Sequence, residues 1–180
     1  MKKSLFIAFC VLIVVIGSVI LWQEQAIAPT VTDNKQAADY KNISYTIDNK
    51  TVTLVNGIAE TNATPGSDLK TITNYFGNEV RADFNADGRE DVAFLLTQDT
   101  GGSGTFVYIA AALGTQNGYT DTNTVLLGDR VAPQTTEFRD GEIIVNYADR
   151  KPGEPMATPP SVGVSKYFKV SGDTLTEILK

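Results

Sequence analysis

The sequence predicts an all-β domain made of antiparallel strands, a single meander that closes as a sandwich or a barrel. From residue 43 onward, short apolar or alternating runs are separated by turns rich in Gly, Asn and Asp, a spacing typical of antiparallel β structure. Thr, Val, Gly, Asn and Asp are abundant, and runs of Ala, Leu, Glu and Lys are scarce, which favours strands over helices. The pattern is compatible with one short helix in the domain.

Eight runs carry the strand pattern: ISYTI (43–47), TVTLV (51–55), DVAFLL (91–96), TFVYIAAAL (105–113), NTVLL (123–127), EIIVNYA (142–148), KYFKV (166–170) and LTEIL (175–179). Residues 67 to 76 fit either a strand or one face of a helix, and we favour a strand. Residues 150 to 162 contain Pro152, Pro155, Pro159 and Pro160, which supply no ladder N–H groups. This segment is therefore expected to be an extended loop.

The N-terminus predicts a membrane segment. Lys2 and Lys3 precede an uncharged apolar run over residues 5 to 22, and at about 1.5 Å per residue this run just spans a hydrocarbon core. We expect residues 1 to 22 to form an uncleaved transmembrane helix that anchors the chain, with the remainder on the extracytoplasmic side by the positive-inside rule. The chain is then a single-pass protein of a bacterial cell membrane. In the alternative, cleavage after Ala28 releases a secreted protein.

Residues 23 to 42 are polar and lack a sustained apolar period, so they predict a flexible linker between the anchor and a β domain at residues 43 to 180. The formal net charge is −6, and no segment concentrates Lys and Arg. Nucleic acid is therefore not an expected partner, because phosphate binding needs a basic cluster. Cys10 lies within the apolar run and is the single cysteine, so the domain forms no disulfide.

The chain contains no histidine, which removes the Ser-His-Asp and Cys-His catalytic machineries and imidazole zinc sites. We therefore expect a binding or structural module rather than an enzyme, with an envelope protein or a glycan as its unidentified partner. Two alternatives stay open. One is a histidine-independent hydrolase that uses paired carboxylates; the other is an inhibitor or chaperone of another envelope protein, which would expose an apolar patch.

One stretch, ADFNADGREDVAF at residues 82 to 94, carries the candidate site residues. Asp83, Asn85 and Asp87 stand at alternate positions, the spacing at which calcium loops present their first three side-chain ligands. Arg89 would add its carbonyl oxygen, and Asp91 would close the site directly or through water. Hard oxygen ligands favour calcium over zinc or copper.

The loop departs from an EF-hand at one decisive position, because Phe94 stands where an EF-hand has its bidentate Glu. The expected affinity for calcium is therefore modest, about 10⁻⁴ to 10⁻³ M, and the ion would be structural. The alternative interpretation is a polar turn, since Asp and Asn side chains also satisfy local backbone donors without any metal.

The order of motifs DFNADGREDVAFLL, DTGGSGTFVYIAAAL, VLLGDRV and PGEPM resembles a family of uncharacterised exported or lipid-anchored bacterial proteins. The resemblance implies an extracytoplasmic location and a domain type, and it implies no activity. Members often carry a lipobox and cysteines in the Pro-rich loop, whereas this chain has no lipobox and has Ala157 and Thr158 in that loop. The acidic loop alone resembles the calcium loops of FG-GAP and dockerin-type repeats, but the lack of a second copy argues against a propeller or a dockerin.

Overall fold

The computed structural model describes residues 39 to 64 and 66 to 180, and in this part of the chain the prediction of an all-β fold with antiparallel sheets is confirmed. A 3-10 turn, η1 (Tyr40–Asn42), precedes the strands β1 (Ser44–Ile47), β2 (Lys50–Thr53), β3 (Ile58–Asn62), β4 (Lys70–Ala82), β5 (Asp91–Asp99), β6 (Thr105–Thr115), β7 (Gly118–Asp121), β8 (Val125–Asp129), β9 (Ala132–Arg139), β10 (Glu142–Asp149), β11 (Val162–Ser171) and β12 (Thr174–Ile178).

The predicted membrane anchor and the first part of the predicted linker lie outside the described residues. Within those residues, no helix combines the length and the apolar character needed to cross a membrane. All eight predicted strand runs overlap strands of the structure, residues 67 to 76 contribute the start of β4, and residues 150 to 161 form a loop as expected. Three strands were not predicted, namely β3, β7 and β9.

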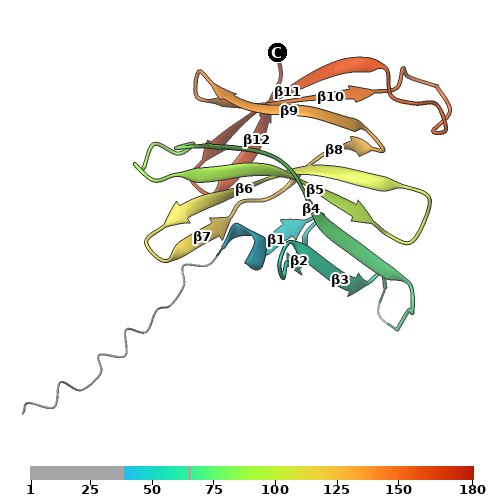
Figure 1. The fold of residues 1–180 in the computed structure, drawn as a ribbon, viewed down its shortest axis with the longest axis horizontal. Coiled ribbons are helices and arrows are strands. Elements are labelled where there is room, and N and C mark those ends of the chain that lie inside the picture. The colour runs from blue at the N-terminus through green and yellow to red at the C-terminus, as the bar shows by residue number, and fades with distance from the viewer. Residues whose placement is uncertain (1–38, 65) are drawn as a thin grey trace, which may run out of the picture. The chain divides into compact units, whose positions relative to one another are not determined.

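The strands form three layers (Figure 1). The central layer is a six-stranded sheet in the order β3-β4-β5-β6-β7, with β8 also paired to β6. A four-stranded sheet in the order β12-β11-β10-β9 lies on one side of β5 and β6, and the β1–β2 hairpin lies on the other. The third layer, formed by the hairpin, was not part of the predicted sandwich or barrel.

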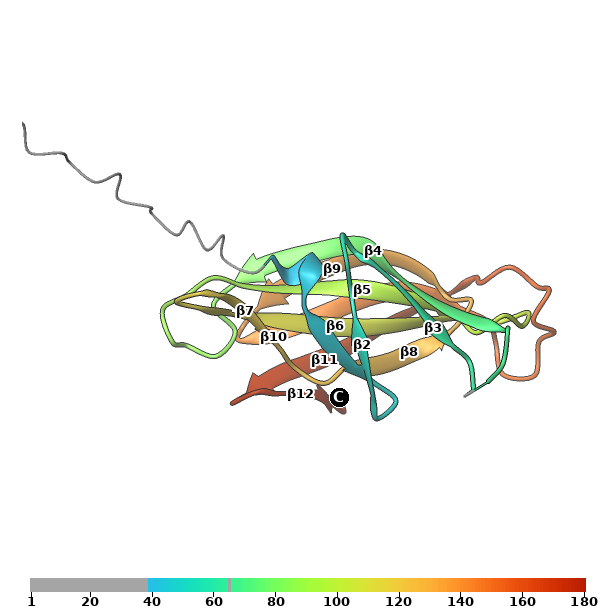
Figure 2. The ribbon, with the colours of Figure 1, turned by 90° about the horizontal axis from the view of Figure 1, so that it is seen from below.

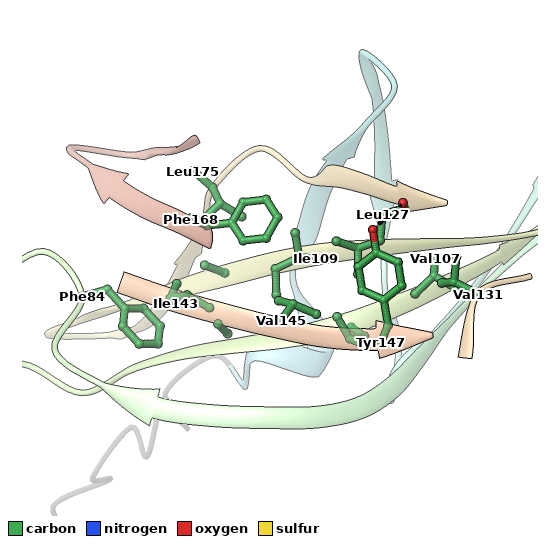
Figure 3. Packing of buried hydrophobic residues seen from close by; sticks show 13 residues of the cluster. Phe84, Val107, Ile109, Leu127, Val131, Ile143, Val145, Tyr147, Phe168 and Leu175 are labelled. Atoms are coloured by element: carbon green, nitrogen blue, oxygen red, sulfur yellow. Dashed lines mark hydrogen bonds between the residues drawn. The ribbon is translucent and has the colours of Figure 1, made fainter. Parts of the chain in front are cut away.

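Burial on both faces explains the long apolar runs of β5 and β6. Alternate residues of a strand point to opposite faces of its sheet, and Ala93, Leu95 and Ile109 point into the core against the four-stranded sheet. Figure 3 shows this core, where Ile143, Val145 and Tyr147 of β10 and Phe168 of β11 meet the central layer.

The second core lies on the opposite face of the central sheet. Val92, Phe94 and Leu96 of β5 pack there against residues of the β1–β2 hairpin, including Tyr45 and Ile47. These five side chains are at most 1% exposed. The two faces of one central strand therefore belong to two separate cores.

Residues 40 to 42, expected in the linker, belong to the folded domain. The Asp39 side chain caps η1 by accepting a hydrogen bond from the Lys41 backbone amide. Tyr40 is 8% exposed and packs in the second core, and its hydroxyl donates to Glu79 of β4 (2.8 Å). The burial of one aromatic ring thus moves the start of the domain ahead of residue 43.

A short segment between β7 and β8 connects the three layers. The Thr122 amide donates to the Ala111 carbonyl of β6 (3.0 Å), and the Thr124 amide donates to the Thr46 carbonyl of β1 (3.1 Å). Between them, the Asn123 side chain exchanges two hydrogen bonds with the Leu175 backbone of β12 (2.8 and 3.0 Å). The Asn123 amide therefore acts as a strand partner for the edge of the four-stranded sheet.

We expect Asn123→Ala to lower the free energy of unfolding by about 1–3 kcal/mol, because it leaves the N–H and C=O groups of Leu175 without their partner. Urea unfolding, followed by the far-UV circular dichroism of the strands, measures this loss. Asn117→Ala, at an exposed turn, is the matched control. Equal stability of the two variants would show that the contact between residue 123 and β12 contributes nothing.

Candidate metal centre

In the loop between β4 and β5, side-chain oxygens accept hydrogen bonds from backbone amides of the same loop. The Asp87 amide donates both to Asp83 Oδ1 (3.0 Å) and to Asn85 Oδ1 (3.1 Å), and the Gly88 amide donates to Asp83 Oδ2 (2.8 Å). Ala86 (φ 60°) and Gly88 (φ 83°) adopt the left-handed conformation that curls the chain. Because two oxygens accept from one N–H group, the Asp83 and Asn85 side chains converge on the same point of the loop.

Asp87 lies beside these two side chains, and we call the group of Asp83, Asn85 and Asp87 the arc. Its Oδ1 accepts from the Arg89 amide (2.9 Å), and its Oδ2 accepts from Asn85 Nδ2 (3.3 Å) and from the Arg89 guanidinium (3.1 Å). The hydrogen bond from the Arg89 amide holds the pKa of the Asp87 carboxyl below its usual value, so this group is ionised at neutral pH. An added cation would compete with the Arg89 guanidinium, which is 43% exposed.

Asp91 is held by backbone amides, and its closing of an ion site, directly or through water, stays a prediction. It is fully buried, and its two oxygens accept hydrogen bonds from the Phe84 amide and the Gly114 amide (both 2.8 Å). Burial raises the pKa of the Asp91 carboxyl, the two amide donors oppose that rise, and the charges of Asp87 and Asp83 add to it. Asp91 thus ties the loop to the end of β6.

Asp83, Asn85 and Asp87 are brought together, but the full predicted ligand set is not assembled as one group. In the chain from residue 39 onward, leaving out residue 65, no three acidic, histidine or cysteine side chains form a cluster suited to a metal ion. Asn85 is not one of these residue types, and the oxygens of Asp91 accept hydrogen bonds from backbone amides. Arg89 contacts the arc through its guanidinium, whereas the prediction used its carbonyl oxygen.

Gly114 is the site residue that sequence reasoning missed. A Cβ atom added at this position would lie 2.5 Å from the Glu90 carbonyl oxygen, so only glycine lets β6 approach the loop closely enough to reach Asp91. The available signal is a glycine directly after the long predicted strand run over residues 105 to 113, because a glycine in a strand often marks a close approach of backbone. This signal could have marked Gly114 as a position of close packing, but it does not show that Asp91 is the partner.

Away from this loop, a hollow of about 430 Å³ lies between β2 and β3. Its lining includes one carboxylate, that of Asp48, and this group accepts a hydrogen bond from the Tyr108 hydroxyl (2.7 Å). The hollow therefore lacks the pair of carboxylates that the hydrolase alternative requires. That alternative stays a prediction without an assigned pair of residues.

Comparison of the chain with protein-family models, with curated proteins and with solved structures finds no match. The resemblance to exported bacterial proteins and to FG-GAP or dockerin-type loops therefore stays a prediction from the motifs.

Proposed function

We propose that the chain is a binding or structural module held on the extracytoplasmic side of a bacterial cell membrane by a transmembrane helix over residues 5 to 22, with calcium stabilising the loop at residues 83 to 91. The proposed location rests on the apolar run and the two lysines before it. The partner, an envelope protein or a glycan, is not identified by the anchor or by the loop.

The observation that supports the calcium loop is the convergence of the Asp83 and Asn85 oxygens on the Asp87 amide. A loop whose ligand side chains are already held by backbone donors loses little conformational freedom when an ion binds. Asp83, Asn85 and Asp87 would bind the cation, and water would complete the six to eight oxygens that calcium prefers. The carboxylates supply the negative charge that a hard divalent cation offsets.

Asp91 adds a dependence on pH. Because its pKa is raised in the folded state, the stability linked to protonation of Asp91 is fully present below the unfolded pKa and is lost as the pH rises through the folded pKa, whereas the hydrogen bonds from the Phe84 and Gly114 amides remain. A cation beside the buried carboxylate would offset this loss. Stabilisation by calcium is therefore expected to be larger at pH 7 than at pH 4.

We expect 10 mM calcium to stabilise a fragment of residues 35 to 180, which contains all the described strands, by about 1–3 kcal/mol. This corresponds to a rise of about 4–10 °C in the thermal midpoint relative to chelator. Asp83→Asn combined with Asp87→Asn should abolish the rise, because it removes two negative charges and keeps the side-chain shape.

The control for that experiment is Asp140→Asn, which removes an exposed carboxylate at the turn between β9 and β10. It should retain the full response to calcium. A midpoint that calcium leaves unchanged in the wild-type domain would mean that residues 83 to 91 are a polar turn.

A further inference from the structure

Two exposed apolar side chains lie side by side where β2 turns into β3. Asn56 (φ 52°) and Gly57 (φ 82°) form a tight two-residue turn, and the backbones of Val55 and Ile58 on either side of it exchange two hydrogen bonds (2.8 and 3.2 Å). Residues that pair directly across such a turn point their side chains to the same side. Val55, which is 64% exposed, and Ile58, which is 54% exposed, are therefore neighbours on the surface.

Strand β4 extends this apolar surface. Ile58 pairs with Asn74 of β4, at the position midway between two exposed apolar residues of that strand. Because alternate residues of a strand point to the same face, Ile72 and Phe76 share a face with Ile58 and lie diagonal to it. At the diagonal spacing of about 7–8 Å, side chains of this size reach one another. We call this group the edge patch: Val55, Ile58, Ile72 and Phe76.

The edge patch lies on the half of β4 that precedes a bulge. In the other half of the strand, Val80 and Ala82 pack against the core under the four-stranded sheet. Between the two halves, Gly77 (φ 104°) and Asn78 (φ 50°) adopt left-handed conformations, and the pairing of β4 with β5 shifts its register. Because a bulge bends its strand, the first half of β4 is turned relative to the second, and the side chains of the edge patch stay exposed.

The edge patch adjoins the residues at which the chain enters the domain. The Gly57 amide donates to the Lys41 carbonyl (2.8 Å), and the Asn56 amide donates to Asn42 Oδ1 (2.7 Å), so the turn is bonded directly to η1. The C-terminal end lies on the opposite side of the domain from the connection of β2 and β3 (Figures 1 and 2). The edge patch is therefore on the side of the domain that follows the predicted linker.

The length of the predicted linker limits how far this side can lie from a membrane. Residues 23 to 38, which separate the predicted transmembrane run from the domain, number 16. A flexible chain of this length, as the sequence predicts, has a root-mean-square span of about 20–25 Å and a full extension of about 55 Å. A tether this short gives the surface beside its attachment point a high effective concentration at the bilayer.

We propose that the edge patch inserts its apolar side chains into the interfacial region of the membrane to which the chain is anchored. An exposed apolar patch with a polar rim marks a surface that contacts proteins or membranes, and the short linker favours the membrane. Part of the rim is Glu60, which pairs with Ile72 in the ladder and forms an ion pair with Lys70 (3.4 Å). This inference rests on the proposed function, because the proposed anchor is what brings the patch to the bilayer.

The test is quenching of tryptophan fluorescence by lipids that carry bromine in their acyl chains, with the full chain reconstituted in phosphatidylcholine vesicles. Trp22→Phe removes the single tryptophan of the chain, and Phe76→Trp places a reporter in the edge patch. Bromine quenches over a short range, and interfacial apolar groups lie about 5–10 Å into the boundary of the acyl chains. We expect brominated lipid to lower the emission of this reporter at least twofold relative to unbrominated lipid.

The matched control is Leu179→Trp in the same Trp22→Phe background, because Leu179 is 91% exposed and lies near the C-terminal end. It carries the same indole, so any affinity of tryptophan itself for lipid acts in both variants. Its emission should lose less than half as much as that of the reporter at position 76. Equal quenching at the two positions, or none at position 76, would overturn the proposal, and a patch covered by a second copy or by another protein gives the latter result.

A second variant tests the neighbours of the reporter. Val55→Thr combined with Ile58→Thr keeps the β-branched shape and makes the patch polar, so it should reduce the quenching at position 76 at least by half. Far-UV circular dichroism checks that this variant retains the strands. Unchanged quenching in the folded variant would contradict insertion of the patch.

Flotation of the vesicles at alkaline pH, which strips peripheral contacts, reports on the anchor separately. A chain that floats but is not quenched at position 76 contradicts insertion of the edge patch alone. A chain that is quenched at position 76 at neutral pH but does not float contradicts the proposed anchor alone. A chain that does neither contradicts both.

Discussion

Asp91→Ala is expected to lower the free energy of unfolding by about 2–5 kcal/mol, because each buried donor left without an acceptor costs about 1–3 kcal/mol. The two donors are the amides of Phe84 and Gly114, which both lie 2.8 Å from the Asp91 carboxylate. Loss of the carboxylate also separates the loop from β6. Urea unfolding at pH 7 measures the difference, and wild-type stability of this variant would contradict the anchoring role.

Asp91→Asn distinguishes the contribution of the hydrogen bonds to stability from the contribution of the negative charge. Asparagine keeps one acceptor oxygen and presents an NH2 group to the second amide, so about half of the loss should remain. Since the raised pKa of Asp91 takes away stability as the pH rises through it, the stability of the variant relative to the wild type should increase over that pH range. A stability of the variant that falls relative to the wild type as the pH rises would show that the sign assigned to Asp91 is wrong.

Phe94→Ala should lower the free energy of unfolding by about 3–5 kcal/mol, the range for truncation of a buried aromatic ring. The ring is fully buried, and its centroid lies 5.3 to 5.5 Å from those of Tyr40, Tyr45 and Tyr75. These rings belong to η1, β1 and β4, so the cavity would loosen the hairpin layer from the central sheet.

The control for Phe94 is Phe76→Ala, because Phe76 is 48% exposed on β4. This substitution should cost less than about 1.5 kcal/mol, since much of the ring is already in contact with water. Both variants are compared by urea unfolding and by near-UV circular dichroism of the tyrosines. Equal losses in the two variants would contradict the assignment of Phe94 to a separate second core.

The strand pattern could be predicted because most strands carry apolar runs bounded by turn residues. The continuously apolar run over residues 92 to 96 also indicates a strand that is covered by a layer on each face, because a strand buried on both faces does not alternate between apolar and polar residues. β9 was missed because APQTTEFR is mostly polar and contains Pro133, which lies beside an irregularity in the pairing with β10. Tyr40 was assigned to the linker because a single buried ring leaves no periodic signal.

The arc of Asp83, Asn85 and Asp87 could be predicted because its members are neighbours in sequence and local backbone bonds bring them together. The role of Asp91 could not, because its partner Gly114 is 23 residues away and reaches it only through the pairing of β5 with β6. A single sequence shows alternation and turns, but not which distant backbone amide approaches a buried carboxylate.

Calcium titration of chelator-treated residues 35 to 180, followed through the backbone amide resonances of Asp87, Gly88 and Arg89, decides whether the loop is an ion site. These amides donate to the proposed ligand side chains, so their shifts report directly on the arc. We predict saturable shifts with a dissociation constant of about 10⁻⁴ to 10⁻³ M, absent in the variant that combines Asp83→Asn with Asp87→Asn. Resonances that stay in place up to 10 mM calcium, or move equally in wild type and variant, would contradict the proposed calcium loop.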